Sequence, residues 1–305
     1  MRVALLAGGT GGAKLAAGMQ DVLGGELAVV VNTADDVEIH GLHVSPDPDL
    51  VTYWLAGEID EERGWGVKDD TSVVSERLER LGAPGWFELT DRDLAACLYR
   101  TRFLAEGGTL TAAQEQIASA LGAAARVLPM SEDRVRTRVL TPGGWRGLQE
   151  FLILDRGEAA IEGIEVEGLA EARPTEQVLE VVANAELIVI GPSNPVISIG
   201  PIFSLRGMRE AVAAATAPVI AVSPFVAGRA IKGPTEAFMA AVGRPVSASG
   251  VASLYQGLLD AIVVDSGDPD LPPDGLRVLA CPTLMDGRGG RRALANRVLA
   301  FAGEL

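Results

Sequence analysis

Short apolar runs alternate with helical stretches along much of this chain of 305 residues. The first unit combines VALLA (3–7), a predicted helix over 12–23 and LAVVVN (27–32). From Pro174 onward the alternation returns, with the apolar runs ELIVIG, PVIAVSP, AIVVDSG and LRVLACP. Runs this apolar are typical of strands that are buried on both faces of a parallel sheet. The pattern therefore predicts an α/β fold with a Rossmann-like, doubly wound and mostly parallel sheet.

The middle of the chain has a different pattern. It contains successive helical stretches, among them TSVVSERLERLG, DRDLAACLYRTRFLAEG and LTAAQEQIASALG. We predict that residues 51–135 form a mostly helical insertion over the active site, and that residues 1–50 and 136–305 together form the Rossmann-like core. After the insertion, alternating residues flank Pro142, Gly143 and Gly144, and this pattern predicts a β-hairpin.

Composition excludes several classes of protein. The formal net charge is −15 and no basic stripe is visible, so nucleic acid is not an expected partner. We find no leader and no run of about 18 apolar residues, so we expect no membrane contact and a cytoplasmic location. Cys97 and Cys281 lie far apart and form no metal or redox motif. Both are expected to be buried thiols, as in a reducing compartment.

The first apolar run leads directly into a glycine-rich turn. The turn and the start of the next helix contain Gly8, Gly9, Thr10, Gly11, Gly12 and Lys14. Such a turn lets backbone N–H groups reach a phosphate at a helix N-terminus, and a lysine adds positive charge there. The spacing fits neither a Walker loop nor G-x-G-x-x-G, because Lys14 breaks both patterns. The alternative is that the glycines only pack the helix on the strand.

Two pairs of acids follow the second apolar run. They are Asp35 and Asp36 in NTADD, and Asp47 and Asp49 in SPDPD. Open α/β sheets bind ligands at the carboxyl ends of their strands, and Mg²⁺ prefers carboxylate and phosphate oxygens. We expect the prolines to hold SPDPD extended, so that Asp47 and Asp49 point the same way. In a nicotinamide-binding fold, an acid here would instead bind a ribose hydroxyl.

Polar residues follow two later strands. Gly191, Ser193 and Asn194 lie in GPSNP after ELIVI, and Ser223 follows PVIAV. Two such loops side by side would line one pocket, although prolines also simply make turns.

Two further segments offer groups that could face a flat ring. Trp65 lies in RGWGVKDDT and could stack on an aromatic ligand, or it could be a half-buried surface residue. Asp91 and Arg92 lie in TDRDL, where they either cap a helix or contact a ligand.

Taken together, these segments resemble the 2-phospho-L-lactate transferase (CofD-like) family, which acts in the biosynthesis of the deazaflavin coenzyme F420. The segments GGTGGAKL, VVNTADD, SPDPDLVTYWLAGEID, RGWGVKDDT, LTDRDLA, LPMSEDRVRT, GPSNPVISIGPI and VSPFVAG occur in that order and cover nearly the whole chain. A related group of non-catalytic, nucleotide-sugar-binding regulatory factors shares the glycine-rich opening and is the alternative. A nicotinamide oxidoreductase is a third hypothesis, disfavoured because position 14 lacks the required glycine.

The resemblance implies a reaction and its substrates. A phospho-acid, 2-phospho-L-lactate or phosphoenolpyruvate, is transferred from its GMP-activated diphosphate form to a hydroxyl of the deazariboflavin FO. The expected products are coenzyme F420-0, or its dehydro form, and GMP. Both substrates are small molecules, and the family analogy further implies a homodimer.

The resemblance also implies roles for residues. The GDP portion of the donor would contact the glycine-rich turn with Lys14, the GPSNP loop and Ser223. Asp36 and Asp49 would be the catalytic pair that holds Mg²⁺, and Asp49, Trp65, Asp91 and Arg92 would face FO. Pro48 departs from the leucine expected in relatives, although the acids keep their spacing. The choice among Asp35, Asp36, Asp47 and Asp49 stays open, as does the choice of donor acid.

Overall fold

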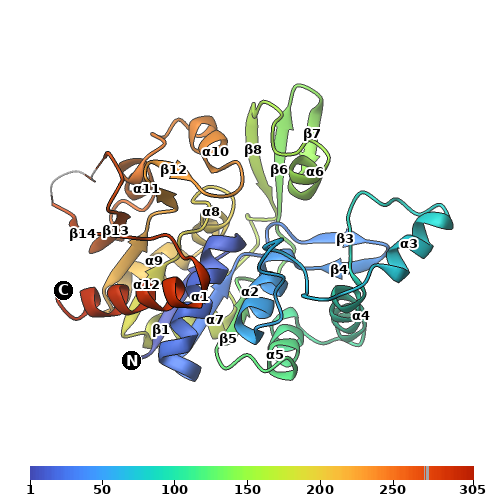
Figure 1. The fold of residues 1–305 in the computed structure, drawn as a ribbon, viewed down its shortest axis with the longest axis horizontal. Helices are drawn as coiled ribbons and strands as arrows, with labels where there is room; N and C mark the ends of the chain where they lie inside the picture. The colour runs from blue at the N-terminus through green and yellow to red at the C-terminus, as the bar shows by residue number, and fades with distance from the viewer. Residues whose placement is uncertain (271, 273–274) are drawn as a thin grey trace.

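The computed structural model describes residues 1–270, 272 and 275–305. In this part of the chain, seven parallel strands form one central sheet (Figure 1). In sheet order the strands are β14 (Arg277–Cys281), β13 (Ala261–Asp265), β10 (Val219–Val222), β9 (Leu187–Ile190), β1 (Val3–Ala7), β2 (Leu27–Val31) and β5 (Arg126–Pro129). The predicted doubly wound α/β sheet is confirmed.

The order of the strands reverses beside β1. Its neighbours are β2 on one side and β9 on the other, with Val3 in register with both Leu27 and Leu187. The chain first builds outward from β1 through β2 to β5, and later builds outward in the opposite direction from β9 to β14. A crevice opens outside the carboxyl ends of the strands at such a switch point, and ligands bind there.

Helices cover both faces of the sheet and create two hydrophobic cores. Along β1, Leu5 packs in the core under α1, α2 and α12, whereas Leu6 packs in the core under α7, α8, α9 and α11. The bounds are α1 (Gly9–Leu23), α2 (Pro46–Ala56), α12 (Gly287–Ala302), α7 (Glu176–Asn184), α8 (Ile199–Ser204), α9 (Met208–Ala214) and α11 (Ala248–Leu254). Side chains alternate between the two faces of a strand, so an apolar β1 serves both cores.

Smaller elements surround the carboxyl edge of the sheet (Figure 1). Three short antiparallel sheets contain β3 (Val37–Ile39) with β4 (Leu42–Val44), β6 (Arg136–Thr141) with β7 (Gly144–Gly147) and β8 (Gly163–Glu167), and β11 (Phe225–Val226) with β12 (Arg229–Ala230). The remaining helices are η1 (Gly24–Glu26), α3 (Val73–Arg80), α4 (Asp91–Ala105), α5 (Leu110–Ala120), α6 (Leu148–Ile153) and α10 (Thr235–Ala241). The β6–β7 pair confirms the predicted hairpin at Pro142–Gly144.

The segment assigned to a helical insertion contains α3, α4 and α5, which lie beside α2 and the β3–β4 hairpin. The same segment also contains β5, which pairs in parallel with β2 and forms an edge of the central sheet. The division into a core and an insertion at residues 50 and 136 stays a prediction. Among the described residues, we find no helix that combines the length and the apolar character needed to cross a lipid bilayer.

Two predicted local structures differ from those observed. Helix α1 begins at Gly9, three residues before the predicted start. SPDPD is not extended but forms the first turn of α2, with Ser45 as the N-cap and Pro46 as the first helical residue. Proline favours this position because its φ suits a helix and its missing N–H would have no partner there. The prolines therefore start a helix.

Candidate active site at the switch point

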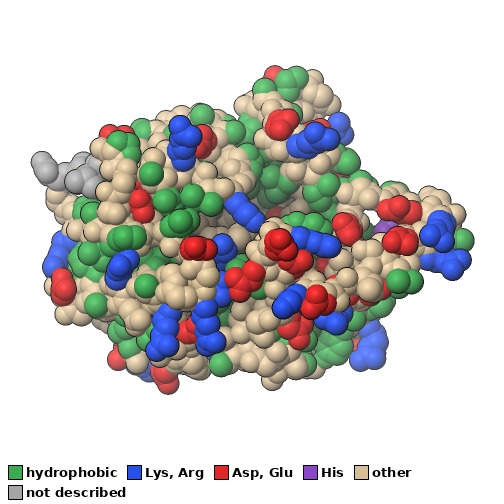
Figure 2. Space-filling view, in the orientation of Figure 1, with side chains coloured by type: hydrophobic (Ala, Val, Ile, Leu, Met, Phe, Trp, Pro, Cys, Tyr) green, Lys and Arg blue, Asp and Glu red, His purple; other side chains and the backbone are tan. Residues whose placement is uncertain are grey.

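The switch-point cavity has a volume of about 330 Å³ and lies where the loops after β1 and β9 meet. Figure 2 shows a hollow between the two halves of the molecule, with basic side chains at its edge. Predicted site residues that line the cavity are Gly8, Gly9, Thr10, Gly11, Lys14, Ser193, Asn194 and Ser223. Gly12 and Gly191 do not line it, because they pack against each other below the loops.

The glycine-rich turn packs closely against the PSNP loop (192–195). A Cβ atom at Gly11 would lie 2.1 Å from the Pro192 carbonyl oxygen, and one at Gly12 would lie 2.4 Å from the Ser193 Oγ. The Gly8 amide donates a hydrogen bond to that same Ser193 Oγ at 3.1 Å. Packing therefore accounts for Gly11 and Gly12, and it fixes the N-terminus of α1 beside the PSNP loop.

Asn194 organises the PSNP loop from within. Its Oδ1 accepts hydrogen bonds from the amides of Val196 and Ile197, at 2.9 and 3.2 Å. Its Nδ2 lies 3.4 Å from the Thr235 Oγ1, at the start of α10. On the next strand, the buried Ser223 Oγ accepts from the Phe225 amide at 3.2 Å. These polar groups shape the wall of the cavity while they remain at its surface.

The N-terminus of α1 already interacts with one carboxylate. Asp47 Oδ1 accepts a hydrogen bond from the Gly9 amide at 2.6 Å, and Asp47 Oδ2 accepts from Asn32 Nδ2 at 3.1 Å. The first N–H groups of a helix have no partner within the helix and attract negative charge. The amides of Thr10 and Gly11 have no side-chain acceptor in the described part of the chain, so they are available to an anion in the cavity.

Asp47 and Asp35 are the carboxylates that line the cavity. Burial raises the pKa of Asp47 to about 6, although the Gly9 and Asn32 hydrogen bonds oppose the rise. Burial, Asp47 and Asp36 raise the pKa of Asp35 well above its usual range. Asp35 also lies 3.3 Å from Asn32 Nδ2 and from Gln149 Nε2. The sequence identified both acids but selected neither of them for the catalytic pair.

The predicted catalytic acid Asp49 points away from the cavity. It pairs with the Arg100 guanidinium, which has no exposed surface and also donates to Gln114 Oε1 at 3.0 Å. Because α2 is helical, residues 47 and 49 are about 200° apart around its axis, so the expectation that they point the same way is wrong. Burial raises the pKa of Asp49, and the Arg100 charge opposes that rise.

The other predicted catalytic acid, Asp36, is buried between α2 and the β3–β4 hairpin. Its Oδ2 accepts from Ser45 Oγ at 2.9 Å and lies 2.8 Å from His43 Nε2. Its Oδ1 is buried with no hydrogen-bond partner among the described residues. A buried carboxylate oxygen without a hydrogen-bond partner destabilises the folded state. A cation or a hydrogen-bond donor from a ligand at this atom would therefore be stabilising.

The acidic residues fit Mg²⁺ by their chemistry. Asp35 and Asp47 present carboxylates to the cavity, and Asp36 Oδ1 has a free coordination position. No group of three or more acid, histidine or cysteine side chains in the described residues is arranged to hold a metal without help. Mg²⁺ usually takes one or two carboxylates and completes its coordination with water and substrate phosphates. The donor set therefore suits a cation that arrives with a phosphate ligand.

Basic groups lie at the same cavity and next to it. Lys14 lines the cavity, and its Nζ lies 5.6 Å from the centre of the Trp54 ring. Arg291 contacts the same ring at 4.7 Å and forms a two-pronged ion pair with Glu61, at 2.7 and 3.1 Å. Burial lowers the pKa of Lys14, and the charges of Lys232 and Arg291 lower it further.

The predicted ring-contacting residues lie outside the switch-point cavity. Trp65 is 45% exposed, with the Arg63 guanidinium 5.5 Å from its ring. The Asp91 carboxylate accepts from the amides of Val73 and Val74 at the start of α3, so it holds that helix in place.

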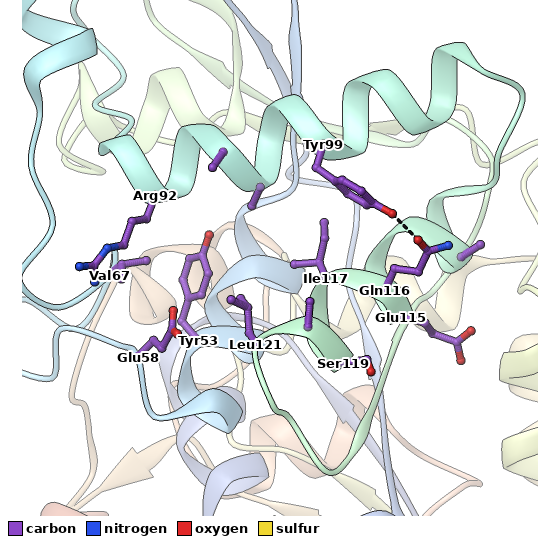
Figure 3. A pocket seen from close by; sticks show the side chains of 14 residues that line it. Tyr53, Glu58, Val67, Arg92, Tyr99, Glu115, Gln116, Ile117, Ser119 and Leu121 are labelled. Atoms are coloured by element: carbon purple, nitrogen blue, oxygen red, sulfur yellow. Dashed lines mark hydrogen bonds between the residues drawn. The ribbon is translucent and has the colours of Figure 1, made fainter.

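Arg92 lines a second cavity of about 870 Å³ between α4 and α5 (Figure 3). Tyr53 from α2 and Ile117 from α5 also border it, and Tyr99 on α4 is hydrogen-bonded to Gln116 on α5. Its lining shares no residue with the switch-point cavity.

The sequence analysis missed several parts of the switch-point cavity, among them Leu148 and Leu152 of α6. The loop between β12 and α10 contributes Lys232, the first residue of α10 contributes Thr235, and the loop after β14 contributes Thr283, Leu284 and Met285. The loop after β14 follows a strand of the central sheet, whereas the loop that carries Lys232 follows the separate β11–β12 pair, and no sequence motif locates either loop. One sequence signal could have pointed to this loop. Lys232 is one of only three lysines among the 26 basic residues of the protein.

Comparison with known proteins assigns the chain to a family. Residues 3–275 match the family described as 2-phospho-L-lactate transferase CofD. A phosphoenolpyruvate transferase from Streptomyces griseus is 39% identical, and the match covers 100% of this chain and 99% of that protein. A 2-phospho-L-lactate transferase from Methanosarcina mazei is 42% identical over 87% of each chain.

A solved structure has the same fold. A UPF0052-family protein from Bacillus halodurans superposes with a TM-score of 0.64 over 98% of each chain, at 15% sequence identity. That likeness concerns the fold, whereas the sequence matches run through the glycine-rich turn, the acidic residues and the PSNP loop. On the sequence matches, the chain belongs to the 2-phospho-L-lactate transferase (CofD) family.

Proposed function

We propose that this protein transfers a phospho-acid from a GMP-linked diphosphate donor to a hydroxyl of FO. The observation that carries the proposal is the switch-point cavity, which combines a helix N-terminus, Lys14 and two carboxylates. The family and the names of its relatives support 2-phospho-L-lactate or phosphoenolpyruvate as the acid. The related nucleotide-sugar-binding factors would need no such pairing of cavity-facing acids with a phosphate site.

In the proposed reaction, the FO hydroxyl oxygen attacks the phosphorus that carries the acid. A new P–O bond forms to FO, the P–O bond to GMP breaks, and GMP leaves with the bridging oxygen. The hydroxyl proton leaves to a base or to solvent. Such a reaction depends mainly on positioning and on neutralising the phosphate charge, because the protein forms no covalent bond to the substrate.

We propose that the diphosphate lies at the N-terminus of α1. The Thr10 and Gly11 amides and Lys14 would hold its oxygens, with Ser193, Asn194 and Ser223 forming the opposite wall. The close contact between Gly11 and Pro192 supports this placement, because it brings both loops to the lining of one cavity. A diphosphate gains from the helix N-terminus and from the lysine charge together.

We propose that Mg²⁺ binds with the donor, held by Asp47 and Asp35 on the cavity side, with Asp36 and Asp49 as the alternative pair. The orientation of the carboxylates favours Asp47 and Asp35 over the alternative pair, since Asp49 is paired with Arg100 inside the protein. When bound, Mg²⁺ would supply positive charge to the phosphate oxygens. Asp47 is instead placed to accept the FO proton if it does not hold the cation, because it lines the cavity and its raised pKa of about 6 leaves it ionised near neutral pH.

The FO contacts are proposed from the resemblance and one observation. Lys232 lines the cavity and donates to the Arg63 carbonyl at 3.1 Å, so the loop that carries Trp65 borders the donor site. A half-exposed Trp65 in that loop is available to stack on a deazaflavin ring. Arg92 and Asp49 remain proposed contacts, and Asp91 would act by holding α3.

The test is a direct assay. FO is mixed with protein, Mg²⁺ and a GMP-linked donor that carries either 2-phospho-L-lactate or phosphoenolpyruvate. We expect FO to gain the mass of one phospho-acid with equal release of GMP, and we expect no product without Mg²⁺. Mass spectrometry of both products also identifies the preferred donor. If neither donor gives product while a nucleotide sugar binds tightly, the protein is a binding factor and the proposal is wrong.

A further inference from the structure

Lysine is rare in this protein and is concentrated at one place. Three of the 26 basic residues are lysines, namely Lys14, Lys68 and Lys232, and all the others are arginines. Lys14 and Lys232 are separated by more than 200 residues, yet both line the switch-point cavity. Lysine presents a compact point charge on a flexible stem, whereas arginine presents a flat fork, and the two are not interchangeable. Two of the three lysines therefore line this one cavity, and Lys68 alone lies outside its lining.

Neither ammonium group forms an ion pair within the described residues. The Lys14 Nζ lies over the Trp54 ring, and the Lys232 Nζ donates to the neutral carbonyl of Arg63 at 3.1 Å. Carboxylates are abundant, since the chain has 41 acidic residues and a net charge of −15. Two unpaired ammonium groups beside a helix N-terminus thus form a local positive site in an acidic protein.

The two lysines are close enough to affect each other. Besides burial, the Lys232 charge is the largest influence that lowers the pKa of Lys14, and Arg291 adds to it. Glu61 and Asp286 oppose the shift but do not cancel it. A bound anion of two or more charges would offset this repulsion, because both ammonium groups line the cavity in which it would bind.

Lys232 is held by a contact that a phosphate can replace. Its Nζ lies against Gly64, where a Cβ atom would be 2.2 Å away, and its partner is a backbone carbonyl. The neutral carbonyl leaves the ammonium charge uncompensated, whereas an anionic phosphate oxygen would add the attraction between opposite charges. The exposed Ile231 and Lys232 lie in the loop between β12 and α10, so the ammonium can turn toward the cavity with little rearrangement.

We propose that Lys232 and Lys14 form a two-ammonium clamp for a diphosphate group, and that Lys232 exchanges the Arg63 carbonyl for a phosphate oxygen when the ligand binds. The inference rests on the proposed function and adds to it a second cationic residue from the loop between β12 and α10. The clamp neutralises charge on both sides of the diphosphate. It also links donor binding to the 60–66 loop, because the Arg63 carbonyl loses its partner.

GDP binding tests the clamp without any transfer reaction. Calorimetric titrations compare wild type with Lys232→Met, Lys14→Met and Lys68→Met. Lys68 is the matched control, because it is the third lysine and does not line the cavity. We expect GDP affinity to fall about 10- to 100-fold in each cavity variant and to be unchanged in Lys68→Met. The dependence of affinity on salt should become shallower in Lys232→Met, since one ionic contact is lost.

Two results would overturn the clamp. One is wild-type GDP affinity in Lys232→Met. The other is a loss of affinity with an unchanged salt dependence and a lowered melting temperature, which indicates a structural role. If wild type does not bind GDP, inorganic pyrophosphate is titrated instead. Pyrophosphate binding that depends on Lys232 supports the clamp and removes the guanine nucleotide from the proposed function. Absence of binding to both ligands overturns the clamp.

Discussion

Asp47 and Asp49 are two residues apart on α2 and face opposite sides of that helix. Asp47 accepts a hydrogen bond from the Gly9 amide and lines the switch-point cavity, whereas Asp49 pairs with the buried guanidinium of Arg100. One carboxylate thus faces the ligand site, and the other joins α2 to α4. The same two-residue spacing in a strand would have placed both carboxylates together.

Replacing Asp47 with Asn is expected to lower transferase turnover about 100-fold, because it removes a cavity carboxylate that would hold the cation. In wild type, kcat/KM should fall as the pH drops through about 6, the pKa to which burial raises Asp47. Stopped assays from pH 5 to 8 at a fixed Mg²⁺ concentration well below saturation measure both effects, because bound Mg²⁺ would compete with the proton for this carboxylate. A flat profile over this range, or full activity in Asp47→Asn, would contradict the assignment.

The buried acids should make the protein less stable as the pH rises. Burial raises the pKa of Asp47 and Asp93 to about 6 each and also raises that of Asp35, so the folded state holds protons that the unfolded state releases near pH 4. Unfolding therefore releases protons between about pH 4 and 6, and the free energy of unfolding falls with rising pH in this window.

Melting temperatures at a series of pH values check this prediction. Carboxyls with lowered pKa values, such as those of Asp21 and Glu61, lose their stabilising effect only at lower pH, so they do not mask it. Added Mg²⁺ should raise the melting temperature more at pH 7.5 than at pH 5. A melting temperature that climbs steadily from pH 5 to 7.5 without Mg²⁺ would show that these acids are not the buried, protonated groups described above.

The Arg100–Asp49 pair is expected to behave as a buried ion pair. Arg100→Met leaves the Asp49 carboxylate buried without its partner and should cost about 3–5 kcal/mol of unfolding free energy. Asp49→Leu combined with Arg100→Met should recover most of that loss, because both charges are then absent. Denaturant unfolding of the two single variants and the double variant gives the coupling energy. Additive losses would mean that the two side chains do not interact.

The fold and the phosphate side of the site could be predicted because they depend on local patterns. Apolar runs such as Val3–Ala7 identify strands buried on both faces, and a glycine-rich turn after the first strand locates the switch point. The glycine-rich turn and the PSNP loop then meet through strand order alone, since β1 and β9 are neighbours.

The choice among the acids could not be predicted, because it depends on helix phase and on distant partners. Whether Asp47 or Asp49 faces the cavity follows from α2 starting at Pro46, and proline fits both an extended segment and a first helical turn. The partner of Asp49 is Arg100, 51 residues further along the chain, and no motif joins them. Lys232 likewise reaches the cavity from a loop whose position only the tertiary structure defines.

Gly11→Ala is expected to separate the two loops that form the donor site. The added Cβ would lie 2.1 Å from the Pro192 carbonyl oxygen, so backbone has to move, at a cost of about 1–3 kcal/mol. The matched control is Gly289→Ala in α12, since both glycines are the third residue of their helix and a Cβ at Gly289 meets nothing within 4 Å.

The control should gain about 0.5–1 kcal/mol, because alanine favours a helix over glycine. GDP affinity and unfolding free energy are measured on both variants. Together they show whether the glycine-rich turn builds the ligand site or only packs the helix on the strand. Loss of GDP binding in Gly11→Ala, with binding retained in Gly289→Ala, means that the close approach of the two loops builds the ligand site. Gly11→Ala that loses stability but binds GDP normally means that the glycines serve packing alone, and the diphosphate must then lie elsewhere in the cavity.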